Sequence, residues 1–400
     1  MTSKLSIHDS LILTANYWYN DEQFPNILST NKDLSPEEIL SYFNNENLYP
    51  IEPNKAWLYI HIPFCKTQCL YCDITTKVEN RIQKYSEYIF CLKQEAYSHY
   101  KAYWKKLPIE TLYIWWWTPS ILPLEYVKEL FEMIHSFYDL SKCFQITFEW
   151  SPYTLTESYL QELLKLWVNR ITMGVQTFED DLLKNYNRPQ IFQDTIDIIN
   201  IAKKLWFLCV NVDLIAWLPW QTQSWFVDTL KILLREARPT TFFAHAFQPT
   251  LRTPFHKWWK KYTQYHIVQR KKLFKLWKIL SEKLNSLNTQ PVYNFQLYDI
   301  SYSYKSIIWL GYWAISTIPW SVMYYWDSYD EYVSYYSKKH THSFLSGLIM
   351  KPEDRYYAFI LKSLMWNWVS KEKFFKIFHI RLEELHIYDV CFSQENKYFI

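Results

Sequence analysis

Short apolar runs alternate with amphipathic segments from residue 57 onward. Amphipathic helical patterns, with apolar residues three and four positions apart, lie between the runs, for example at 124–138 and 157–167. Strands that alternate with helices at this spacing predict parallel βαβ units and an α/β fold. Six units predict a barrel or a three-quarter barrel that binds ligands at the carboxyl ends of its strands. The six strand-like runs cover residues 57–62, 111–114, 145–149, 170–175, 208–215 and 241–247.

The pattern differs on either side of these units. The first 55 residues are polar and rich in asparagine, with one short helix predicted in "SPEEILSYF". Ser35 would cap the first turn of this helix, and the Glu38 side chain would complete a capping box with it. A long helix is expected near 264–285. We therefore expect three regions: an N-terminal extension over 1–55, a core domain over 56–255, and a C-terminal accessory domain of mixed or helical structure over 256–400.

Charge and hydropathy exclude several classes of protein. The 43 basic and 40 acidic side chains give a net charge of only +3, which argues against a nucleic-acid binder or an electrostatic membrane binder. No apolar run approaches membrane-spanning length, and the first residues lack the charged and apolar regions of a signal peptide. Seven cysteines, an odd number, do not predict a disulfide framework. We expect a cytoplasmic protein without an integral membrane segment.

Glycine is scarce and tryptophan is abundant. Average usage of roughly 7% predicts about 28 glycines in a chain of this length, but the sequence has three glycines and 21 tryptophans. Several tryptophans stand where turns call for glycine: Trp206 after an amphipathic run, Trp217 and Trp220 around a Leu-Pro pair, and Trp313 shortly after Gly311. We hypothesise that a UGA codon that the source organism reads as glycine has been translated as tryptophan. The alternative is a genuinely tryptophan-rich protein.

Three cysteines cluster directly after the first predicted strand. The segment "YIHIPFCKTQCLYC" places Cys65, Cys69 and Cys72 in a C-x3-C-x2-C spacing. Thiolates are soft ligands suited to zinc or to iron–sulfur clusters. A closed zinc site requires four ligands, and the nearest fourth candidate, His61, lies within the strand. Three thiolates on a [4Fe–4S] cluster would instead leave one iron open to a small molecule.

With the aromatic Tyr71 before the third cysteine, this loop resembles that of the radical S-adenosylmethionine (SAM) superfamily. The resemblance implies a partial (β/α)6 TIM-like barrel. It also implies that the open iron binds the amino and carboxylate groups of SAM, and that an electron from a donor such as a flavodoxin or ferredoxin releases a 5′-deoxyadenosyl radical. The cofactors would carry this chemistry, and the protein would position them.

Further segments resemble successive motifs of the oxygen-independent coproporphyrinogen III oxidase family, which includes a haem chaperone branch. They are "LYIHIPFC", "IETLYIWWWTPS", "FEWSP", "VNRITMGVQTF" and "VNVDLIAWLPWQT". In that family the second motif is Gly-Gly-Gly-Thr-Pro, so the tryptophans at 115–117 fall on its glycines. Glycines there would let the backbone pass close to the SAM amino group, which three indoles would block.

The resemblance also implies a set of SAM ligands. Tyr59 would lie beside the sulfonium, and Trp116 and Trp117 (as glycines) would follow the methionine part together with Thr118. Taken alone, Glu149 or Asp213 could equally be a solvated or salt-bridged carboxylate, and the matching motifs favour the role of a SAM ligand. The expected polar partners of the SAM ribose and carboxylate are Glu149, Gln176, Arg188 and Asp213.

Isolated cysteines and a lone histidine are expected to be structural. Cysteines outside a motif are usually small buried side chains, and we read His245, in "FFAHAFQPT", as a structural histidine rather than one that faces substrate. The isolated cysteines are Cys91, Cys143, Cys209 and Cys391.

Two departures from the family patterns bear on the choice of branch. The oxidase proper carries a further cysteine two residues after the third ligand, whereas Cys72 is followed by Asp73 and Ile74, as in the chaperone branch. The chaperone motif for haem, His-Asn-x-x-Tyr, is matched only by "YNFQLY" at 293–298, which lacks the histidine. The extension over 1–55 is more like that of the oxidase.

We therefore predict a protein that binds one [4Fe–4S] cluster and SAM and that acts on or carries a tetrapyrrole, either haem or coproporphyrinogen III. It should be most like the haem chaperone branch. The alternatives are oxidative decarboxylation of propionates to vinyl groups and another haem-modifying radical reaction.

Overall fold

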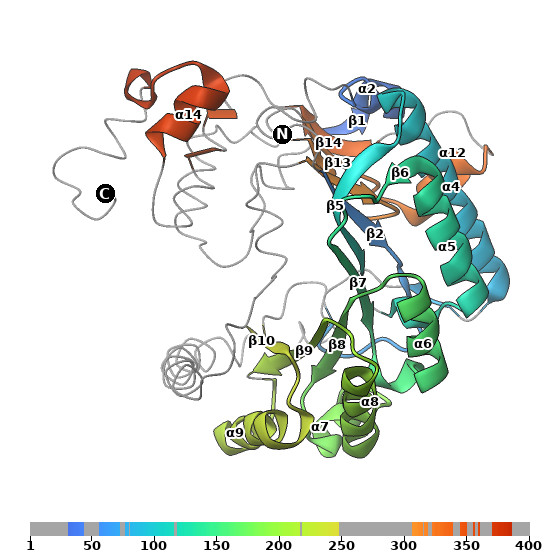
Figure 1. Ribbon diagram of the computed structural model, residues 1–400, viewed down its shortest axis with the longest axis vertical. Helices are drawn as coiled ribbons and strands as arrows, with labels where there is room; N and C mark the ends of the chain where they lie inside the picture. The colour runs from blue at the N-terminus through green and yellow to red at the C-terminus, as the bar shows by residue number, and fades with distance from the viewer. Residues whose placement is uncertain are drawn as a thin grey trace, which may run out of the picture.

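The structure is a computed structural model in which one large sheet carries helices on its outer face (Figure 1). The segment near 264–285, the 293–298 segment and Cys391 lie outside the described residues. The described residues are 31–43, 56–72, 77–79, 81–115, 118–216, 218–247, 306–314, 316–318, 322–338, 345–349, 355–356, 359–360 and 370–385.

Six parallel strands form the core of the sheet, and they fall on the six predicted runs. Each strand pairs in parallel with the next one along the chain. The spatial order therefore follows the sequence order, as in a barrel, and the sheet stays open rather than closing on itself. The predicted α/β partial barrel is confirmed. The strands are β2 (Ala56–His61), β5 (Leu107–Trp115), β7 (Gln145–Trp150), β8 (Arg170–Gln176), β9 (Cys209–Ala216) and β10 (Thr241–Ala246).

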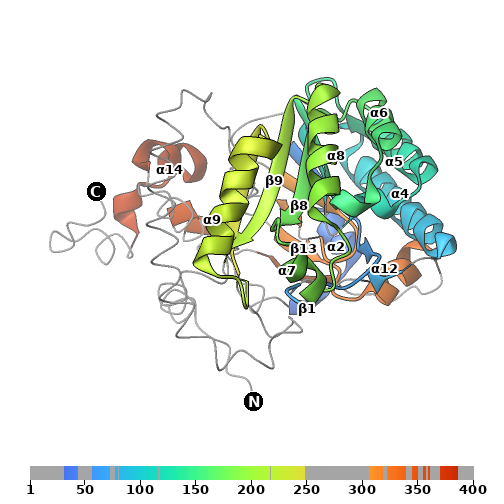
Figure 2. The same cartoon turned by 90° about the horizontal axis from the view of Figure 1, so that it is seen from below.

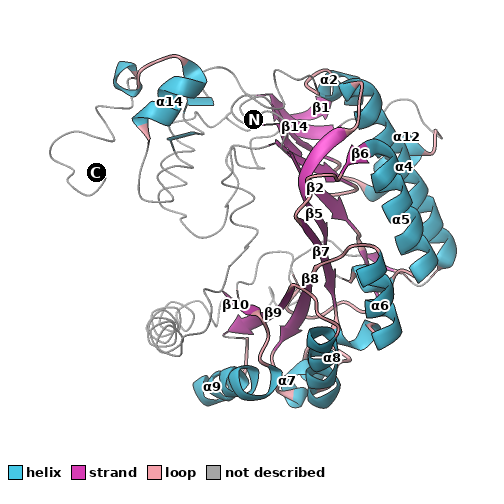
Figure 3. Cartoon of the chain, viewed as in Figure 1, coloured by secondary structure: helices cyan, strands magenta, loops and turns pink. Residues whose placement is uncertain are grey.

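Amphipathic helices cover the outer face of these strands (Figures 1 and 3). Seen from below, α4, α5, α6 and α8 follow one another around the sheet (Figure 2). The patterns predicted at 124–138 and 157–167 form α5 and α6, and Thr156 caps α6 by accepting the backbone N–H of Tyr159 at 3.3 Å. The helices are α4 (Ile82–Tyr103), α5 (Leu124–Phe137), α6 (Glu157–Lys165), α7 (Asp180–Asn185), α8 (Phe192–Lys204) and α9 (Gln223–Ile232).

The sheet continues beyond β2 with strands from both ends of the chain. A parallel strand, β11 (Ser306–Leu310), pairs directly with β2. The strands that follow are antiparallel: β12 (Ser316–Ile318), β13 (Val322–Tyr325), β14 (Leu345–Ile349) and β1 (Asn31–Leu34). The predicted accessory region and N-terminal extension thus add strands to the same sheet as the core, while the domain boundaries themselves stay predictions.

Short helices accompany these added strands. The helix predicted in the extension is α2 (Pro36–Leu40), where the Ser35 hydroxyl accepts the backbone N–H of Glu38 at 3.0 Å. Towards the carboxyl end lie α12 (Tyr329–Tyr336) and α14 (Lys371–Phe378). The Ser35 cap predicted from the sequence is therefore present.

The turn after β11 is anchored to α4 through a glycine. Gly311 has a φ of 107°, and a Cβ there would collide with the Tyr88 hydroxyl. Its backbone N–H donates to Glu95 Oε2 at 2.8 Å, and the next N–H, of Tyr312, donates to the Tyr88 hydroxyl at 3.0 Å. Only glycine can occupy this position without moving its neighbours.

The two faces of the sheet differ in polarity. Apolar residues such as Ile146 and Phe148 on β7 join the core beneath the helices. The residues that alternate with them point to the inner face and are largely polar, because successive side chains of a strand lie on opposite faces. These inner positions include Gln145, Thr147, Glu149, Arg170, Thr172, Asn211 and Asp213. A polar inner face is unusual for a barrel core, and it marks the place where a polar ligand would bind.

Candidate functional site

The three motif cysteines lie in the loop that follows β2. The loop begins at β3 (Phe64–Cys65), and the Cys72 backbone N–H donates to the Cys69 carbonyl at 3.1 Å. All three thiols are buried, with exposed fractions of 3%, 2% and 3% for Cys65, Cys69 and Cys72. In the part of the chain that the structure describes, no three potential ligands converge on a single metal ion. A [4Fe–4S] cluster would take each of the three thiolates at a separate corner.

Arg188 connects the cysteine loop to the barrel. Its Nη1 donates to the Tyr71 hydroxyl at 2.9 Å and to Cys69 Sγ at 3.7 Å. Its Nη2 donates to Ser151 Oγ at 3.4 Å and to the Gly174 carbonyl. Burial alone would lower the pKa of Arg188, but Tyr71 and Cys69 outweigh burial and raise it, so the guanidinium stays charged. A positive charge here would offset the negative charge of a thiolate-bound cluster.

Hydroxyl groups surround the first cysteine. Cys65 Sγ lies 3.7 Å from Thr118 Oγ1 and 3.9 Å from the Tyr153 hydroxyl. Thr118 Oγ1 also lies 3.3 Å from Ser151 Oγ. The predicted Thr118 is therefore beside the cysteine loop. Ser151 and Tyr153 were not predicted, although both follow the carboxyl end of β7, where ligands of such sheets are usually found.

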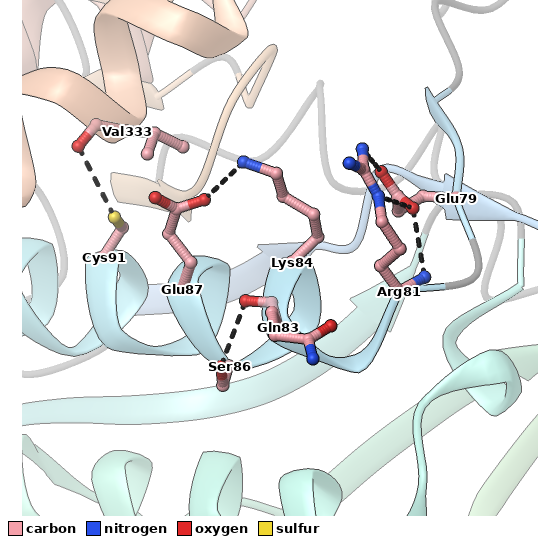
Figure 4. Close-up of polar contacts among 8 residues, drawn as sticks. All are labelled: Glu79, Arg81, Gln83, Lys84, Ser86, Glu87, Cys91 and Val333. Carbon is pink, nitrogen blue, oxygen red and sulfur yellow. Dashed lines mark hydrogen bonds and ion pairs between the residues drawn. The ribbon is translucent and has the colours of Figure 1, made fainter.

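The chain leaves the cysteine loop through a fixed segment that leads into α4. The backbone N–H of Glu79 donates to the Cys65 carbonyl at 3.2 Å, which ties the exit of the loop to its start. Arg81 donates to both carboxylate oxygens of Glu79, at 2.9 and 2.7 Å (Figure 4). The Tyr85 hydroxyl donates to the Glu79 carbonyl at 2.7 Å. These contacts fix the loop relative to the first long helix.

Cys91, on α4, behaves as the sequence predicts for an isolated cysteine. Its thiol is fully buried, and Sγ donates to the Val333 carbonyl of α12 at 3.8 Å (Figure 4). Cys143 and Cys209 are free and half-buried. His245 lies on β10. None of these residues belongs to the cysteine loop.

Two carboxylates lie on the inner face of the sheet. Tyr113 donates to Glu149 Oε1 at 2.7 Å, and Asn211 donates to Asp213 Oδ1 at 2.8 Å. Burial, and then the charge of Asp213, raise the pKa of Glu149 well above its ordinary value, although Tyr113 and Arg170 oppose the shift. Burial raises the pKa of Asp213 to about 6, against the opposing effects of Asn211 and Arg170. At neutral pH Asp213 is therefore largely ionised, whereas the shift at Glu149 favours its protonated form.

Arg170 is a further inner-face residue that sequence reasoning missed. It begins β8, is 5% exposed, and lowers the pKa of both carboxyl groups. Its Nε and Nη1 have no hydrogen-bond partner among the described residues. The signal that could have found it is the period-two alternation of polar and apolar residues along "RITMGVQ".

Tyr59 lies on the inner face at the strand that leads to the cysteine loop. Its hydroxyl is 3.3 Å from His61 Nδ1. Three other rings pack around it, with centroid distances of 4.1 Å to Trp309, 5.8 Å to Trp115 and 6.5 Å to Tyr113. The space expected for the SAM sulfonium is therefore filled with aromatic side chains.

Gln176 ends β8 in a left-handed conformation, with a φ of 70°. A Cβ on Gly174 would lie 2.8 Å from Gln176 Nε2 and 3.3 Å from Arg188 Nη2, so glycine at 174 makes room for both side chains. The predicted Gln176 and Arg188 are thus neighbours at the rim. Trp116 and Trp117 lie outside the described residues, and the SAM-binding roles of the whole set stay predictions.

Comparison with known proteins supplies the family context. Residues 59–233 match the sequence profile of the Radical SAM superfamily. The haem chaperone HemW of Lactococcus lactis is 36% identical over 173 residues, which cover 43% of this chain and 44% of that protein. The oxygen-independent coproporphyrinogen III oxidase of Bradyrhizobium diazoefficiens is 29% identical over 193 residues, which cover 48% of this chain and 43% of the oxidase. The chain thus spans about half the length of the curated relatives it matches.

A solved structure shares the fold over most of both chains. It is the coproporphyrinogen III oxidase of Escherichia coli, a radical SAM enzyme, with a TM-score of 0.71 and coverage of 94% of this chain and 88% of the other. The two sequences are 19% identical, so the likeness concerns the fold. Separately, a search of the described helices finds none with the length and apolar character needed to cross a bilayer.

Proposed function

Because residues 59–233 match the model of the Radical SAM superfamily, we propose that Cys65, Cys69 and Cys72 hold one [4Fe–4S] cluster whose fourth iron binds SAM. The observation that carries this proposal is the set of three buried thiols in one loop, which Arg188 ties to a polar inner face. A cluster held by these three cysteines would supply the electron that cleaves SAM to a 5′-deoxyadenosyl radical in this superfamily.

The protein's own residues would bind and orient SAM and shield it from water. Thr118 and Arg188, which contact Cys65 and Cys69, would fix the end of SAM that reaches the cluster. Asp213, largely ionised at neutral pH, would accept hydrogen bonds from ribose hydroxyl groups. Glu149, whose raised pKa favours the protonated form, could in that form both donate and accept. Tyr59 would cover the reacting sulfur and exclude water from it.

A tetrapyrrole is the proposed substrate or cargo, and we place the protein nearest the haem chaperone branch in the cytoplasm. Two features support this: similarity to a haem chaperone, and the Asp73-Ile74 sequence after Cys72, which lacks the additional cysteine expected of the oxidase. An electron donor such as a flavodoxin or ferredoxin would reduce the cluster.

Oxidative decarboxylation of coproporphyrinogen III is the second candidate. It is favoured by the long N-terminal extension, which is more like that of the oxidase and which supplies edge strand β1 to the sheet. This reaction removes a hydrogen atom from a propionate β-carbon, and loss of carbon dioxide and one further electron then leaves a vinyl group.

The two candidates differ in measurable products. After anaerobic reconstitution with iron and sulfide, the protein should turn brown and bind SAM, with a change in the electron paramagnetic resonance spectrum of the reduced cluster. A haem chaperone should bind haem in an absorbance titration and leave coproporphyrinogen III unchanged. An oxidase should release 5′-deoxyadenosine and carbon dioxide from coproporphyrinogen III. A protein that stays colourless, or that holds zinc in place of iron, would overturn the proposal.

A further inference from the structure

Half of the described non-glycine residues with positive φ are tryptophans. Ten such residues occur, and the five tryptophans among them have φ values between 63° and 66°. A residue with a Cβ is strained in this left-handed region, whereas glycine enters it freely. Bulky side chains are normally rare there. The five are Trp104, Trp167, Trp206, Trp220 and Trp313.

Three of these tryptophans end helices as glycine normally does. The Trp167 N–H donates to the Leu164 carbonyl at 3.0 Å, and the Val168 N–H donates to the Leu163 carbonyl at 3.1 Å. This pair of bonds is the Schellman motif, whose left-handed residue is usually glycine. Trp104 and Trp206 end α4 and α8 in the same left-handed conformation.

The indoles at these helix ends have no packing role that would offset the strain. Trp104 is 90% exposed, Trp206 is 89% exposed and Trp167 is 77% exposed. A large apolar ring held in water contributes no burial, so a side chain is not what the fold requires at these positions. The backbone conformation is the feature they share.

Other tryptophans fit their surroundings as tryptophan. Trp326 is 1% exposed and absent from the positive-φ residues, and its ring lies 5.3 Å from that of Tyr335 and 5.8 Å from that of Tyr332. Trp57 donates from Nε1 to Glu110 Oε2 at 3.1 Å. The structure therefore separates the tryptophans into two groups: those with a left-handed backbone that suits glycine, and those whose side chains pack or form hydrogen bonds.

Trp309 also belongs with the positions that suit glycine, but because of its side chain rather than its backbone conformation. It lies opposite Tyr59 in the pairing of β11 with β2, and it is 7% exposed. Its indole N–H has no acceptor in the described part of the chain, although buried indole N–H groups normally have one. Together with Trp115 it fills the inner face beside Tyr59.

We infer that the functional protein carries glycine at the five left-handed tryptophans and at Trp309. We further infer that removing the ring of Trp309 opens space beside Tyr59 in which SAM can bind. The second statement rests on the proposed function, whereas the first rests on backbone geometry at the five left-handed positions and on the unpaired, buried indole N–H at Trp309. The sequence already indicated glycine at Trp206, Trp220 and Trp313. The structure adds Trp104, Trp167 and Trp309, and it leaves Trp57 and Trp326 as tryptophan.

Peptide sequencing by tandem mass spectrometry of the protein purified from its source cells tests the first statement. Glycine is expected at Trp104, Trp167, Trp206 and Trp309, each with the mass loss of an indolylmethyl group, and tryptophan at Trp326. Tryptophan at the first four positions would overturn the inference. Glycine at Trp326 as well would overturn the separation into two groups.

Recombinant, cluster-loaded protein tests the second statement. Starting from a chain with glycine at 104, 115–117, 167, 206, 217, 220 and 313, the variant Trp309→Gly should bind SAM at least ten-fold more tightly in equilibrium dialysis than the chain that keeps Trp309. The control Trp326→Gly should lower the melting temperature without improving binding. Equal SAM affinity with and without the Trp309 ring overturns the pocket assignment. A cluster that forms normally while neither chain binds SAM counts against the proposed function, and the mass spectrum is unaffected by that outcome.

Discussion

Replacement of Asp213 by asparagine should stabilise the protein while weakening SAM binding. Asp213 is partly buried on the inner face, and burial raises its pKa from 3.8 to about 6. A difference of about 2 pKa units (6 − 3.8) corresponds to ~3 kcal/mol of free energy that favours the protonated form in the folded state. The ionised carboxylate is therefore a cost to folding, which asparagine removes. The Asn211 side chain, which donates to Asp213 Oδ1 at 2.8 Å, would keep an acceptor in the new amide.

The contribution of Asp213 to the free energy of unfolding depends on pH. The folded state holds the Asp213 proton more tightly than the unfolded state, so stability is greatest below pH 3.8 and falls as the pH rises through about 6. The Asp213→Asn variant should therefore exceed its parent in stability by about 0.5 kcal/mol at pH 4 and by about 3 kcal/mol at pH 7.5.

Urea denaturation of the cluster-free parent and variant, at both pH values, measures this difference. Asp228→Asn is the matched control, because Asp228 is about half exposed and forms a surface ion pair with Lys231 at 2.7 Å, and such pairs contribute little. SAM binding to the cluster-loaded variant should weaken by about ten-fold or more, as for the loss of a hydrogen bond to a charged group. A variant no more stable than its parent at pH 7.5 would refute the reasoning.

Three other substitutions test separate parts of the site. Cys72→Ser should abolish the brown absorbance and bound iron after reconstitution, whereas Cys91→Ser should keep both; equal loss in the two would contradict the assignment of the cluster ligands. Arg188→Lys keeps the charge, but lysine cannot contact all the partners of the guanidinium. We therefore expect the variant to lose about 2 kcal/mol or more of stability in thermal unfolding and to lose iron to a chelator faster. Unchanged stability and iron retention would show that the contacts of Arg188 with the cysteine loop are dispensable. Arg170→Gln removes a charge that lowers the pKa of Asp213, so the pH of half-maximal SAM binding should rise; a fall would mean that this charge does not act on the carboxylates.

The sequence predicted the core of the fold because its signals are local. The six parallel strands are apolar runs separated by amphipathic helices, and both patterns are legible within a window of about ten residues. The cysteine loop was found in the same way, since its three thiols lie within one short segment. Thr118, next to Cys65, came from a resemblance, and the structure brings the two within 3.7 Å.

Such local signals could not predict which strands from distant parts of the sequence pair with one another. Nothing in "SIIWL" at 306–310 says that it lies beside β2, some 250 positions earlier, because a strand's partner is decided by the surfaces that both present. The same holds for Arg170, whose inward direction depends on which face of β8 the helices cover. Charges that act on one another from different strands, as Asp213 and Glu149 do, become visible only when the strands are side by side.

The position of β11 beside β2 has a consequence for dissecting the protein. The strand that leads to the cysteine loop has neighbours on both sides, β5 from the core and β11 from the distal half of the chain. Shortening the protein at the end of the core region would strip one neighbour away and leave a row of unsatisfied amide and carbonyl groups next to the cluster ligands. Such an exposed row recruits strands from other molecules, so the isolated core should self-associate through the very strand that carries the metal loop.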